Sequence, residues 1–269
     1  MSIWEAIIIG LVQGLTEFLP ISSTAHIVLA SRWMGIDSEG LVLEIYLHFA
    51  SVLAVIAYFR RDLWAVISGF LRYLQNRGEA DRPMFFFALY LLVATTLTGV
   101  LGILLTKGLG DHLKSLPVMG GGLLLTAGFL IFIEYGMKIG PRTVEKMTWR
   151  DAVIVGLAQT AAVLPGISRS GATLVAALLC GLERETAVRF SFLLAIPVIL
   201  GSSVLGLKQV TGEWITATGW IPLMISFVVC LIASWLGIIW LIGFLRRKKL
   251  IYFALYCALL GTTLLLIGN

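Results

Sequence analysis

Six apolar stretches, each long enough to cross a lipid bilayer, constrain the fold of this chain more than any other feature of its sequence. A hydrocarbon core of about 30 Å requires roughly 20 residues of helix. The stretches lie at 42–59, 84–106, 117–137, 185–207, 219–245 and 250–268. Only 13% of the 269 residues are charged, about half the share that a soluble domain carries. We therefore predict an all-α polytopic membrane protein and exclude a soluble enzyme, a disordered tail and a secreted disulfide-bonded scaffold.

Two further apolar stretches, at 2–34 and 149–182, are interrupted by proline, serine and glycine. The interruptions read F-L-P-I-S-S-T-A-H at 18–26 and L-P-G-I-S-R-S-G-A-T at 164–173. Backbone groups freed from a helix at membrane depth must bind protein or water, because lipid offers no hydrogen-bond partner. Each stretch is therefore predicted to be a re-entrant helix–break–helix hairpin that lines a protein-enclosed cavity.

An internal duplication relates the two hairpins. A constant shift of 146 positions places Ala6 on Ala152, Gly10 on Gly156, Gln13 on Gln159 and Ser22 on Ser168. We predict a single membrane domain, 1–269, built from a first repeat, 1–146, and a second repeat, 147–269. Each repeat holds one hairpin and three crossing helices. Because three is an odd number, the second repeat enters the membrane upside down, which makes the fold an inverted-topology repeat.

Arginine and lysine residues indicate which side of the membrane each loop faces, because cytoplasmic loops hold most of them. The loops 60–83, 138–150 and 246–249 are rich in these residues, and all three fall on one side of the predicted topology. The opposite loops hold only Lys107, Lys114 and Lys208. We therefore expect both termini on the outer side. The net charge of +5 is a topology signal, and no nucleic acid partner is needed to explain it.

Ionisable side chains inside membrane segments are expensive, by about 2.5 kcal/mol or more each, and so mark candidate functional positions. Here they are Glu17, His26, Glu44, His48, Glu134 and Arg169. Glu134 has Lys138 one turn later, and an i,i+4 ion pair at the interface explains it. Glu44 and His48 form a second i,i+4 pair, which either satisfies itself or faces the cavity. Glu17, His26 and Arg169 flank or occupy the two breaks and are the candidate site residues.

The two breaks together predict an anion site. The half-helix that begins at each break presents unbonded N–H groups and about half a positive charge. Arg169 adds a guanidinium that can bind phosphate oxygens in a bidentate manner. The small and hydroxyl residues that begin the two half-helices include Ser22, Ser23, Thr24, Ser168, Ser170 and Gly171. A phosphate or diphosphate fits this set better than a carboxylate does.

Oxygen donors for a divalent cation stand beside the first break. Gln13 and Glu17 are four residues apart and share one face of the predicted helix, and oxygen ligands suit Mg²⁺ or Ca²⁺. Such a cation would bridge the carboxylate and the phosphate oxygens and remove their mutual repulsion. No histidine and cysteine cluster in the sequence suggests zinc.

Two long motifs, Q-G-L-T-E-F-L-P-I-S-S-T-A-H at 13–26 and P-G-I-S-R-S-G-A-T at 165–173, resemble the signatures of the bacterial undecaprenyl-diphosphatase family, also called bacitracin-resistance proteins. The similarity extends to chain length, hydropathy and motif spacing. It implies removal of the terminal phosphate from undecaprenyl diphosphate, which recycles the lipid carrier for peptidoglycan synthesis and confers bacitracin resistance. It also implies a divalent-cation requirement, a location in the bacterial cytoplasmic (inner) membrane, and an active site open to the periplasm.

Carried over residue by residue, the resemblance implies functional roles at both breaks. The family's acidic motif falls on Gln13 and Glu17, and its serine and histidine fall on Ser23 and His26. Its arginine motif falls on Ser168, Arg169, Ser170 and Thr173. Gln13 stands where many members have a second glutamate, which leaves Glu17 as the main anionic ligand. Ala25 stands where glycine is common, a small change that the same half-helix should tolerate.

Two chemical routes fit the candidate residues. Ser23 is the first candidate for the nucleophile, and a serine needs a base nearby. His26 lies one turn later on the same face, so it could accept that proton or protonate a leaving oxygen. Alternatively, water activated by Glu17 attacks the phosphorus directly. The residues alone do not separate the two routes.

Other classes of function fit the same architecture. Inverted repeats with broken helices also build transporters, so a flippase for polyprenyl phosphate or a carrier for a small anion is the main alternative. A structural membrane protein whose breaks serve only packing is a third class. Serine, histidine and glutamate beside Arg169 favour the enzyme. The expected partners are a polyprenyl diphosphate substrate and membrane lipid, and a homodimer is left open.

Overall fold

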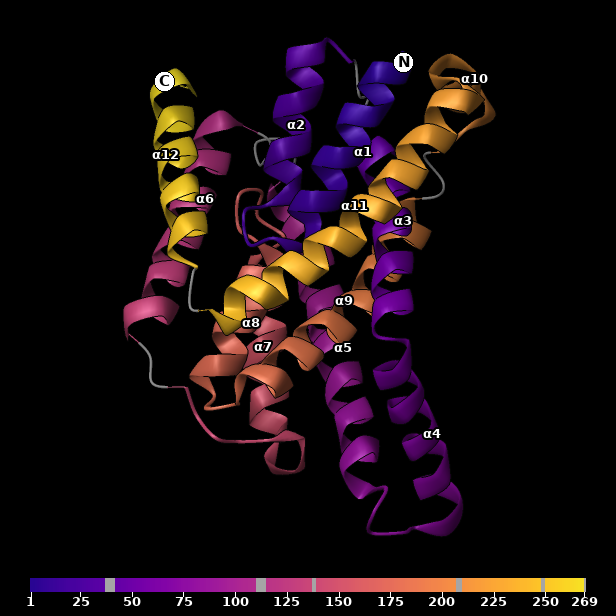
Figure 1. Cartoon of the computed structure of the whole chain (residues 1–269), viewed down its shortest axis with the longest axis vertical. Coiled ribbons are helices and arrows are strands. Elements are labelled where there is room, and N and C mark those ends of the chain that lie inside the picture. The colour runs from indigo at the N-terminus through magenta and orange to yellow at the C-terminus, as the bar shows by residue number, and fades with distance from the viewer. Residues whose placement is uncertain (37–41, 110–114, 137–138, 207–209, 248–249, 269) are drawn as a thin grey trace.

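The computed structural model describes residues 1–36, 42–109, 115–136, 139–206, 210–247 and 250–268, and these ranges contain helices and no strand (Figure 1). The elements of the first half are α1 (Ile3–Phe18), α2 (Ser23–Met34), α3 (Val42–Tyr58), α4 (Arg60–Asn76), α5 (Arg82–Leu109), α6 (Leu116–Ile131) and a π-helix, η2 (Phe132–Gly136). Those of the second half are a 3-10 turn, η3 (Val144–Lys146), α7 (Trp149–Ala161), α8 (Arg169–Leu179), α9 (Arg184–Gly206), α10 (Gly212–Thr218), α11 (Trp220–Arg246) and α12 (Ile251–Gly268).

Five helices among the described residues are long and apolar enough to cross a membrane, and a bent pair raises the number to six. The five are α5, α6 with η2, α9, α11 and α12. They confirm the stretches predicted from 84 onward, although residues 137 and 207 at two of the predicted ends lie outside the described residues. The sixth stretch, 42–59, is the 17-residue α3, and α4 follows it at an angle of 74°.

The two hairpins form at the predicted places. α1 ends at Phe18 and α2 begins at Ser23, while α7 ends at Ala161 and α8 begins at Arg169. Figure 1 shows α1 and α2 in the upper half of the molecule and α7 and α8 in the lower half, with both chain termini at the upper end. The hairpins therefore enter the fold from opposite ends.

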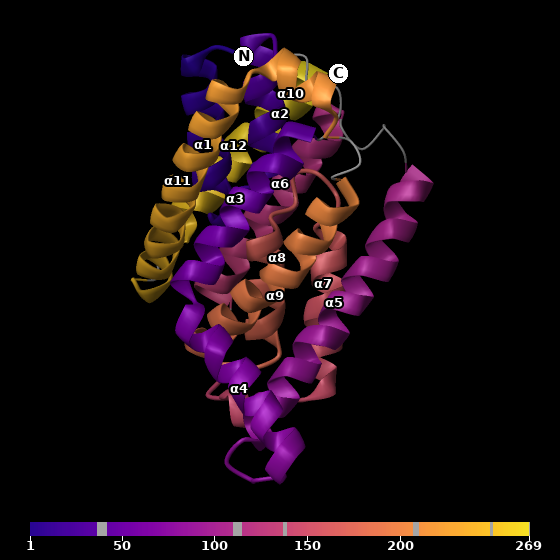
Figure 2. The same ribbon diagram turned by 90° about the vertical axis from the view of Figure 1, so that its right-hand side faces the viewer.

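The two repeats pack their helices in equivalent ways. α1 packs on α11, and α7, its expected counterpart, packs on α5. Two other helices of the first repeat pack directly on their counterparts in the second: α3 packs on α9, and α6 packs on α12. α9 also contacts α5 and lies between α3 and α5 (Figure 2). This exchange of partners supports the predicted boundaries of the two repeats at 1–146 and 147–269, which stay a prediction.

Close approach of α1 to α11 fixes the position of the first hairpin. A Cβ atom added to Gly10 would lie 2.6 Å from the carbonyl oxygen of Ser226, and one added to Gly14 would lie 2.4 Å from that of Cys230. Small residues let helix backbones approach closely where lipid provides no hydrophobic driving force. α1 therefore sits against α11 at a distance that only glycine permits at these two positions.

A partly buried ion pair closes the open end of the second hairpin, where α7 begins and α8 ends. Arg142 donates to both carboxylate oxygens of Asp151, at 3.1 and 2.6 Å, and to the carbonyl oxygen of Cys180 at 2.6 Å. Asp151 also accepts from the backbone N–H of Thr148 and so caps the start of α7. Arg142 thereby ties the start of α7 to the end of α8, in addition to its predicted role as a loop charge.

Glu134 has a different described partner from the one predicted. Lys138, the expected partner in an i,i+4 pair, lies outside the described residues. A carboxylate oxygen of Glu134 instead accepts from the backbone N–H of Leu250 at 3.2 Å, directly before α12 begins. A carboxylate at a helix N-terminus satisfies a free N–H group and complements the helix dipole.

Replacement of Gly14 by alanine tests the packing of α1 on α11. We expect Gly14→Ala to lower the free energy of unfolding by about 1–3 kcal/mol, the usual cost of forcing extra atoms into a packed contact. Thermal unfolding of the purified protein in detergent measures the effect. Gly99→Ala in α5 is the matched control, because a Cβ there meets no atom within 4 Å. Equal melting temperatures for the two variants would contradict the packing argument.

Candidate active site

The two helix breaks contact each other directly. The backbone N–H of Gly166 in the second break donates to the Ser22 hydroxyl in the first at 3.1 Å. Ser22 has φ 68°, and Gly166 has φ 95°. Glycine adopts positive φ freely, but a serine there stores about 1–3 kcal/mol of strain that surrounding contacts must offset. Strained residues of this kind cluster at functional sites.

Thr126 of α6 holds the second break in place. Its hydroxyl donates to the carbonyl oxygen of Gly166 and accepts from the backbone N–H of Ser168, both at 3.0 Å. Two backbone groups freed by the break are thus satisfied by one buried side chain. The sequence offered no pattern that singles out Thr126, because it is one polar residue within a long apolar stretch.

A buried ion pair joins the two hairpins at the predicted site. The Nη2 atom of Arg169, the first residue of α8, lies 2.6 Å from Oε1 of Glu17 in the last turn of α1. The side chains of Arg169 and Glu17 are 16% and 3% exposed. The two charges that the sequence placed at separate breaks, 152 positions apart, therefore contact each other.

The second carboxylate oxygen of Glu17 is the centre of a polar cluster. It accepts from Nε2 of Gln13 at 2.9 Å and from the Ser23 hydroxyl at 2.7 Å, and Nε2 of His48 lies 3.2 Å from it. Gln13 and Glu17 meet because they are one helical turn apart, as predicted. The chain reversal at Pro20 returns Ser23 to the same carboxylate.

Glu44 and His48 of α3 face this cluster and also contact each other. His48 Nε2 lies 3.8 Å from Oε1 of Glu44, and the same oxygen accepts from the Thr24 hydroxyl at 2.6 Å. His48 therefore stands between Glu17 and Glu44, each of which holds a hydroxyl from the first turn of α2. The sequence left open whether this pair satisfied itself or faced the cavity. In the structure the two side chains contact each other and His48 also contacts Glu17, while the cavity role stays a prediction.

His26 is turned away from Ser23. Its Nδ1 lies 2.7 Å from the carbonyl oxygen of Ser22, and its Nε2 lies 2.6 Å from the hydroxyl of Tyr256 in α12. The Ser23 hydroxyl donates to Glu17 instead. In this structure both ring nitrogens of His26 therefore have partners other than Ser23, and its expected role as the base for Ser23 stays a prediction. Tyr256 was missed by the sequence analysis, since it lies 230 positions away without a motif around it.

The predicted hydroxyl residues of the second break are buried and bonded within the start of α8. The Ser168 hydroxyl accepts from the backbone N–H of Gly171 at 3.2 Å and so caps α8, and it lies 3.1 Å from the Ser170 hydroxyl. Thr173 donates to the carbonyl oxygen of Arg169 at 3.0 Å. These residues shape the N-terminus that carries Arg169, and Arg169 alone among them bonds to Glu17.

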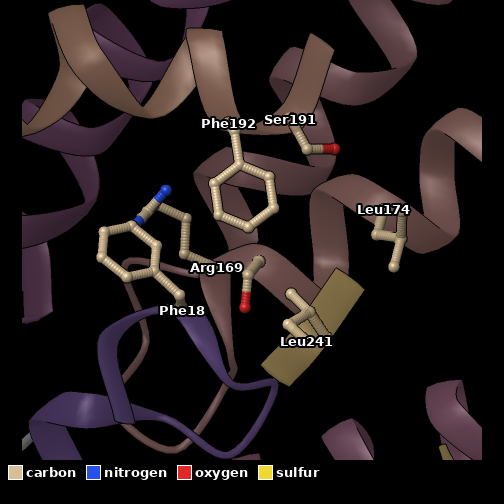
Figure 3. A pocket seen from close by; sticks show the side chains of 7 residues that line it. Phe18, Arg169, Leu174, Ser191, Phe192 and Leu241 are labelled. Atoms are coloured by element: carbon tan, nitrogen blue, oxygen red, sulfur yellow. The ribbon is translucent and has the colours of Figure 1, made fainter. Parts of the chain in front are cut away.

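A small cavity of about 10 Å³ lies beside Arg169, as Figure 3 shows. Its lining residues are Phe18, Arg169, Ser170, Leu174, Ser191, Phe192 and Leu241. Such a volume suits about one water molecule and is too small for a phosphate group. The Ser191 hydroxyl is buried and has no hydrogen-bond partner among the described residues. In this closed arrangement Arg169 binds Glu17 rather than opening toward a ligand.

The amide and carboxylate oxygens of Gln13 and Glu17, beside the first break, are chemically suited to bind a hard divalent cation. Oε1 of Gln13 is buried and has no hydrogen-bond partner within the described part of the chain, and it lies on the residue whose amide nitrogen binds Glu17. Amide and carboxylate oxygens are ligands that Mg²⁺ and Ca²⁺ prefer. Across the described ranges, no group of three or more histidine, cysteine, aspartate or glutamate side chains is arranged to hold a metal ion.

Removal of Arg169 tests the buried ion pair. We expect Arg169→Met to lower the free energy of unfolding by about 3–5 kcal/mol, because it leaves the buried Glu17 carboxylate without its guanidinium. Arg72→Met is the matched control, since Arg72 pairs with Asp81 at 2.8 Å but is 55% exposed, and solvent and salt screen an exposed pair so that its loss costs little. Thermal unfolding in detergent compares them, and equal losses would argue against a buried pair.

Comparison with known proteins agrees with the motifs. The family model described as Bacitracin resistance protein BacA matches residues 6–263. Undecaprenyl-diphosphatase 2 of Halalkalibacterium halodurans is 57% identical over 96% of this chain and 93% of that protein. Undecaprenyl-diphosphatase 1 of Shouchella clausii is 51% identical with the same coverage of 96% and 93%. Undecaprenyl-diphosphatase 3 of Bacillus anthracis is 40% identical over 98% of this chain and 97% of that protein. This chain therefore belongs to the bacitracin resistance protein BacA family.

Proposed function

We propose that this chain is an undecaprenyl-diphosphate phosphatase of the cell membrane. It hydrolyses undecaprenyl diphosphate to undecaprenyl phosphate and inorganic phosphate, which recycles the lipid carrier for cell-wall synthesis and confers bacitracin resistance. The family and the names of its relatives support this activity. One observation carries the assignment to a site: the Ser23 hydroxyl donates to a buried Glu17 carboxylate that is itself paired with Arg169 from the other hairpin.

Substrate binding requires Arg169 to exchange partners. In the closed arrangement its guanidinium binds Glu17 at 2.6 Å. A diphosphate between the two breaks would offer oxygens that a guanidinium binds in a bidentate manner, and the N-termini of α2 and α8 would add N–H groups and dipole charge. Ser22, Thr24, Ser168, Ser170, Gly171 and Thr173 are the residues proposed to shape this pocket. The polyprenyl tail stays among the helices and lipid.

Ser23 and Glu17 form the proposed nucleophile and base. As Ser23 Oγ attacks the terminal phosphorus, its proton passes to the Glu17 oxygen that lies 2.7 Å away. The new Oγ–P bond replaces the bond from that phosphorus to the bridging oxygen, which leaves on undecaprenyl phosphate. Water then cleaves the phosphoserine to release inorganic phosphate. Arg169 stabilises the charge that spreads over the transferred phosphoryl group, which is the main task in phosphoryl transfer.

Direct attack by water is the second route. Glu17 would then take a proton from water rather than from Ser23, and Ser23 would orient that carboxylate. Both routes use Glu17 as the base. In neither does His26 receive the proton first, since its ring nitrogens bind Ser22 and Tyr256.

A divalent cation is part of the proposal. Gln13 and Glu17 would hold Mg²⁺ or Ca²⁺, whose charge would neutralise the diphosphate and polarise its oxygens. The orphaned Gln13 oxygen supports this assignment. Glu17 would supply the carboxylate ligand beside this amide oxygen.

The orientation in the membrane follows from the arginine-rich loop. Arg60, Arg61, Arg72, Arg77 and Arg82 lie on or beside α4, which Figure 1 shows at the end of the molecule opposite both termini. By the positive-inside rule, we propose that this end is cytoplasmic, that both termini are periplasmic, and that the site opens to the periplasm in the cytoplasmic (inner) membrane. A homodimer remains a further proposal.

Substitution of Ser23 separates the two routes. If Ser23 is the nucleophile, Ser23→Ala lowers kcat by about 10³-fold or more, the scale seen when a covalent nucleophile is removed. Phosphate release from undecaprenyl diphosphate by purified protein measures it. Thr96→Ser is the control, because Thr96 is an exposed residue of α5 that bonds only to its own helix. Turnover of Ser23→Ala within a few fold of the unsubstituted protein would assign the attack to water.

Chelation in detergent tests both the cation and the class of function. We expect phosphate release by the detergent-solubilised protein, loss of most of it with a chelator, and recovery on addition of Mg²⁺ or Ca²⁺. A carrier has no gradient to use in detergent, so turnover there favours the enzyme over the transporter or flippase. Full activity in chelator would remove the cation from the proposal, and no phosphate release under any condition would refute the hydrolase.

A further inference from the structure

The strained residue between the two breaks is held from two sides. Ser22 has φ 68° and ψ 96°, and its hydroxyl accepts from the Gly166 N–H of the second break. Its carbonyl oxygen accepts from Nδ1 of His26 at 2.7 Å. Ser22, which joins the two breaks, directly precedes Ser23. The backbone conformation of Ser22 therefore determines the position of Ser23, the proposed nucleophile, at the start of α2.

The partners of His26 determine its tautomer. A carbonyl oxygen only accepts hydrogen bonds, so Nδ1 of His26 carries the proton that points to Ser22. In the neutral ring Nε2 is then the acceptor, and the Tyr256 hydroxyl 2.6 Å away is its donor. The two rings also stack, with centroids 5.5 Å apart and an angle of 20° between their planes. The Ser22 carbonyl thus sets the tautomer of His26, and Tyr256 holds the orientation of its ring.

Tyr256 lies on α12, a helix whose position is determined by close packing on α6. α12 packs on α6 so closely that a Cβ on Gly261 would lie 2.8 Å from the carbonyl oxygen of Gly120. α6 holds the second break through Thr126. α12 reaches the first break twice, through Tyr256 to His26 and through the Cys257 thiol, 3.6 Å from the carbonyl oxygen of Pro20. The α6–α12 pair therefore supports both breaks, one from each helix.

We propose that Tyr256 is a positioning residue of this site. It holds His26 against the strained turn at Ser22, so that the Ser23 hydroxyl keeps its hydrogen bond to Glu17. The chain of contacts runs from Tyr256 through His26 to Ser22 and on to Gly166. His26 serves in it as a fixed Nδ1–H donor. The inference rests on the proposed hydrolysis for its effect on turnover, while the hydrogen bond itself can be tested without substrate.

Tyr256→Phe removes the hydroxyl and keeps the stacked ring. We expect kcat to fall about fivefold, which corresponds to about 1 kcal/mol for one hydrogen bond, with KM within about twofold of the parent value. Tyr252→Phe is the matched control, because Tyr252 lies one turn earlier on α12 and is 58% exposed, and it should leave both constants unchanged. An unchanged kcat for Tyr256→Phe would overturn the proposal.

A double-mutant cycle with His26→Gln shows whether Tyr256 acts through His26. The Tyr256→Phe change should lower kcat in the parent but have no further effect in the His26→Gln background, because the hydroxyl then has no imidazole to orient. The same fivefold loss in both backgrounds would mean that the Tyr256 hydroxyl acts independently of His26, and would refute the positioning role. Rates are compared per mole of protein that elutes as folded in size-exclusion chromatography.

Nitrogen NMR of the ¹⁵N-histidine-labelled protein tests the contact without turnover. The chain has three histidines, and His26→Gln identifies the signals of His26. We expect a protonated Nδ1 and a hydrogen-bonded acceptor Nε2, whose resonance moves toward that of a free acceptor in Tyr256→Phe and stays in place in Tyr252→Phe. An Nε2 resonance that does not move refutes the contact. If the parent protein releases no phosphate, the proposed function fails while this spectrum still decides the contact.

Discussion

The rest of this structure depends on how two interrupted helices satisfy their freed backbone groups away from water. A break within an apolar segment leaves N–H and C=O groups that lipid cannot bind. Here the first break supplies the Ser22 hydroxyl as the acceptor for the Gly166 N–H of the second break, and Thr126 of α6 binds two further backbone groups of the second break. Once the breaks must meet for this reason, the side chains that flank them are brought together as well.

The Glu17 carboxylate is the centre of the polar contacts between the two breaks. Its two oxygens contact Arg169, Gln13, Ser23 and His48, which lie on four different helices or hairpin arms. A carboxylate buried to this degree is stable only when paired and hydrogen-bonded. The same arrangement that stabilises Glu17 places it beside a serine hydroxyl and a guanidinium, so the requirement of folding and the requirement of phosphoryl transfer are met by one set of contacts. In the proposed mechanism, a diphosphate that draws Arg169 away would also free Glu17 to act as a base.

The two site histidines have different surroundings and therefore different tasks. His48 lies between two carboxylates and contacts the proposed base directly. His26 bonds to a backbone carbonyl and a tyrosine, and its proposed task is to order the turn before Ser23. Sequence proximity suggested His26 as the base for Ser23, because residues three apart on a helix share a face. The ring of His26, however, bonds to the carbonyl four residues before it and stacks on α12, and the Ser23 hydroxyl finds a stronger acceptor in Glu17.

The sequence by itself determined the class of fold and the location of the site. Apolar length alone predicts the crossing helices, and the Pro–Ser–Gly interruptions predict both hairpins, since hydropathy and helix breaking are local properties of the chain. It also placed Glu17, Ser23 and Arg169 at the breaks. Only the tertiary structure decided that Glu17 and Arg169 pair directly, that Glu44 and His48 face the site, that α3 and α4 meet at 74°, and that Tyr256 binds His26. Those contacts join residues far apart in the chain, and the direction in which a side chain turns depends on which distant helix offers it a hydrogen-bond partner.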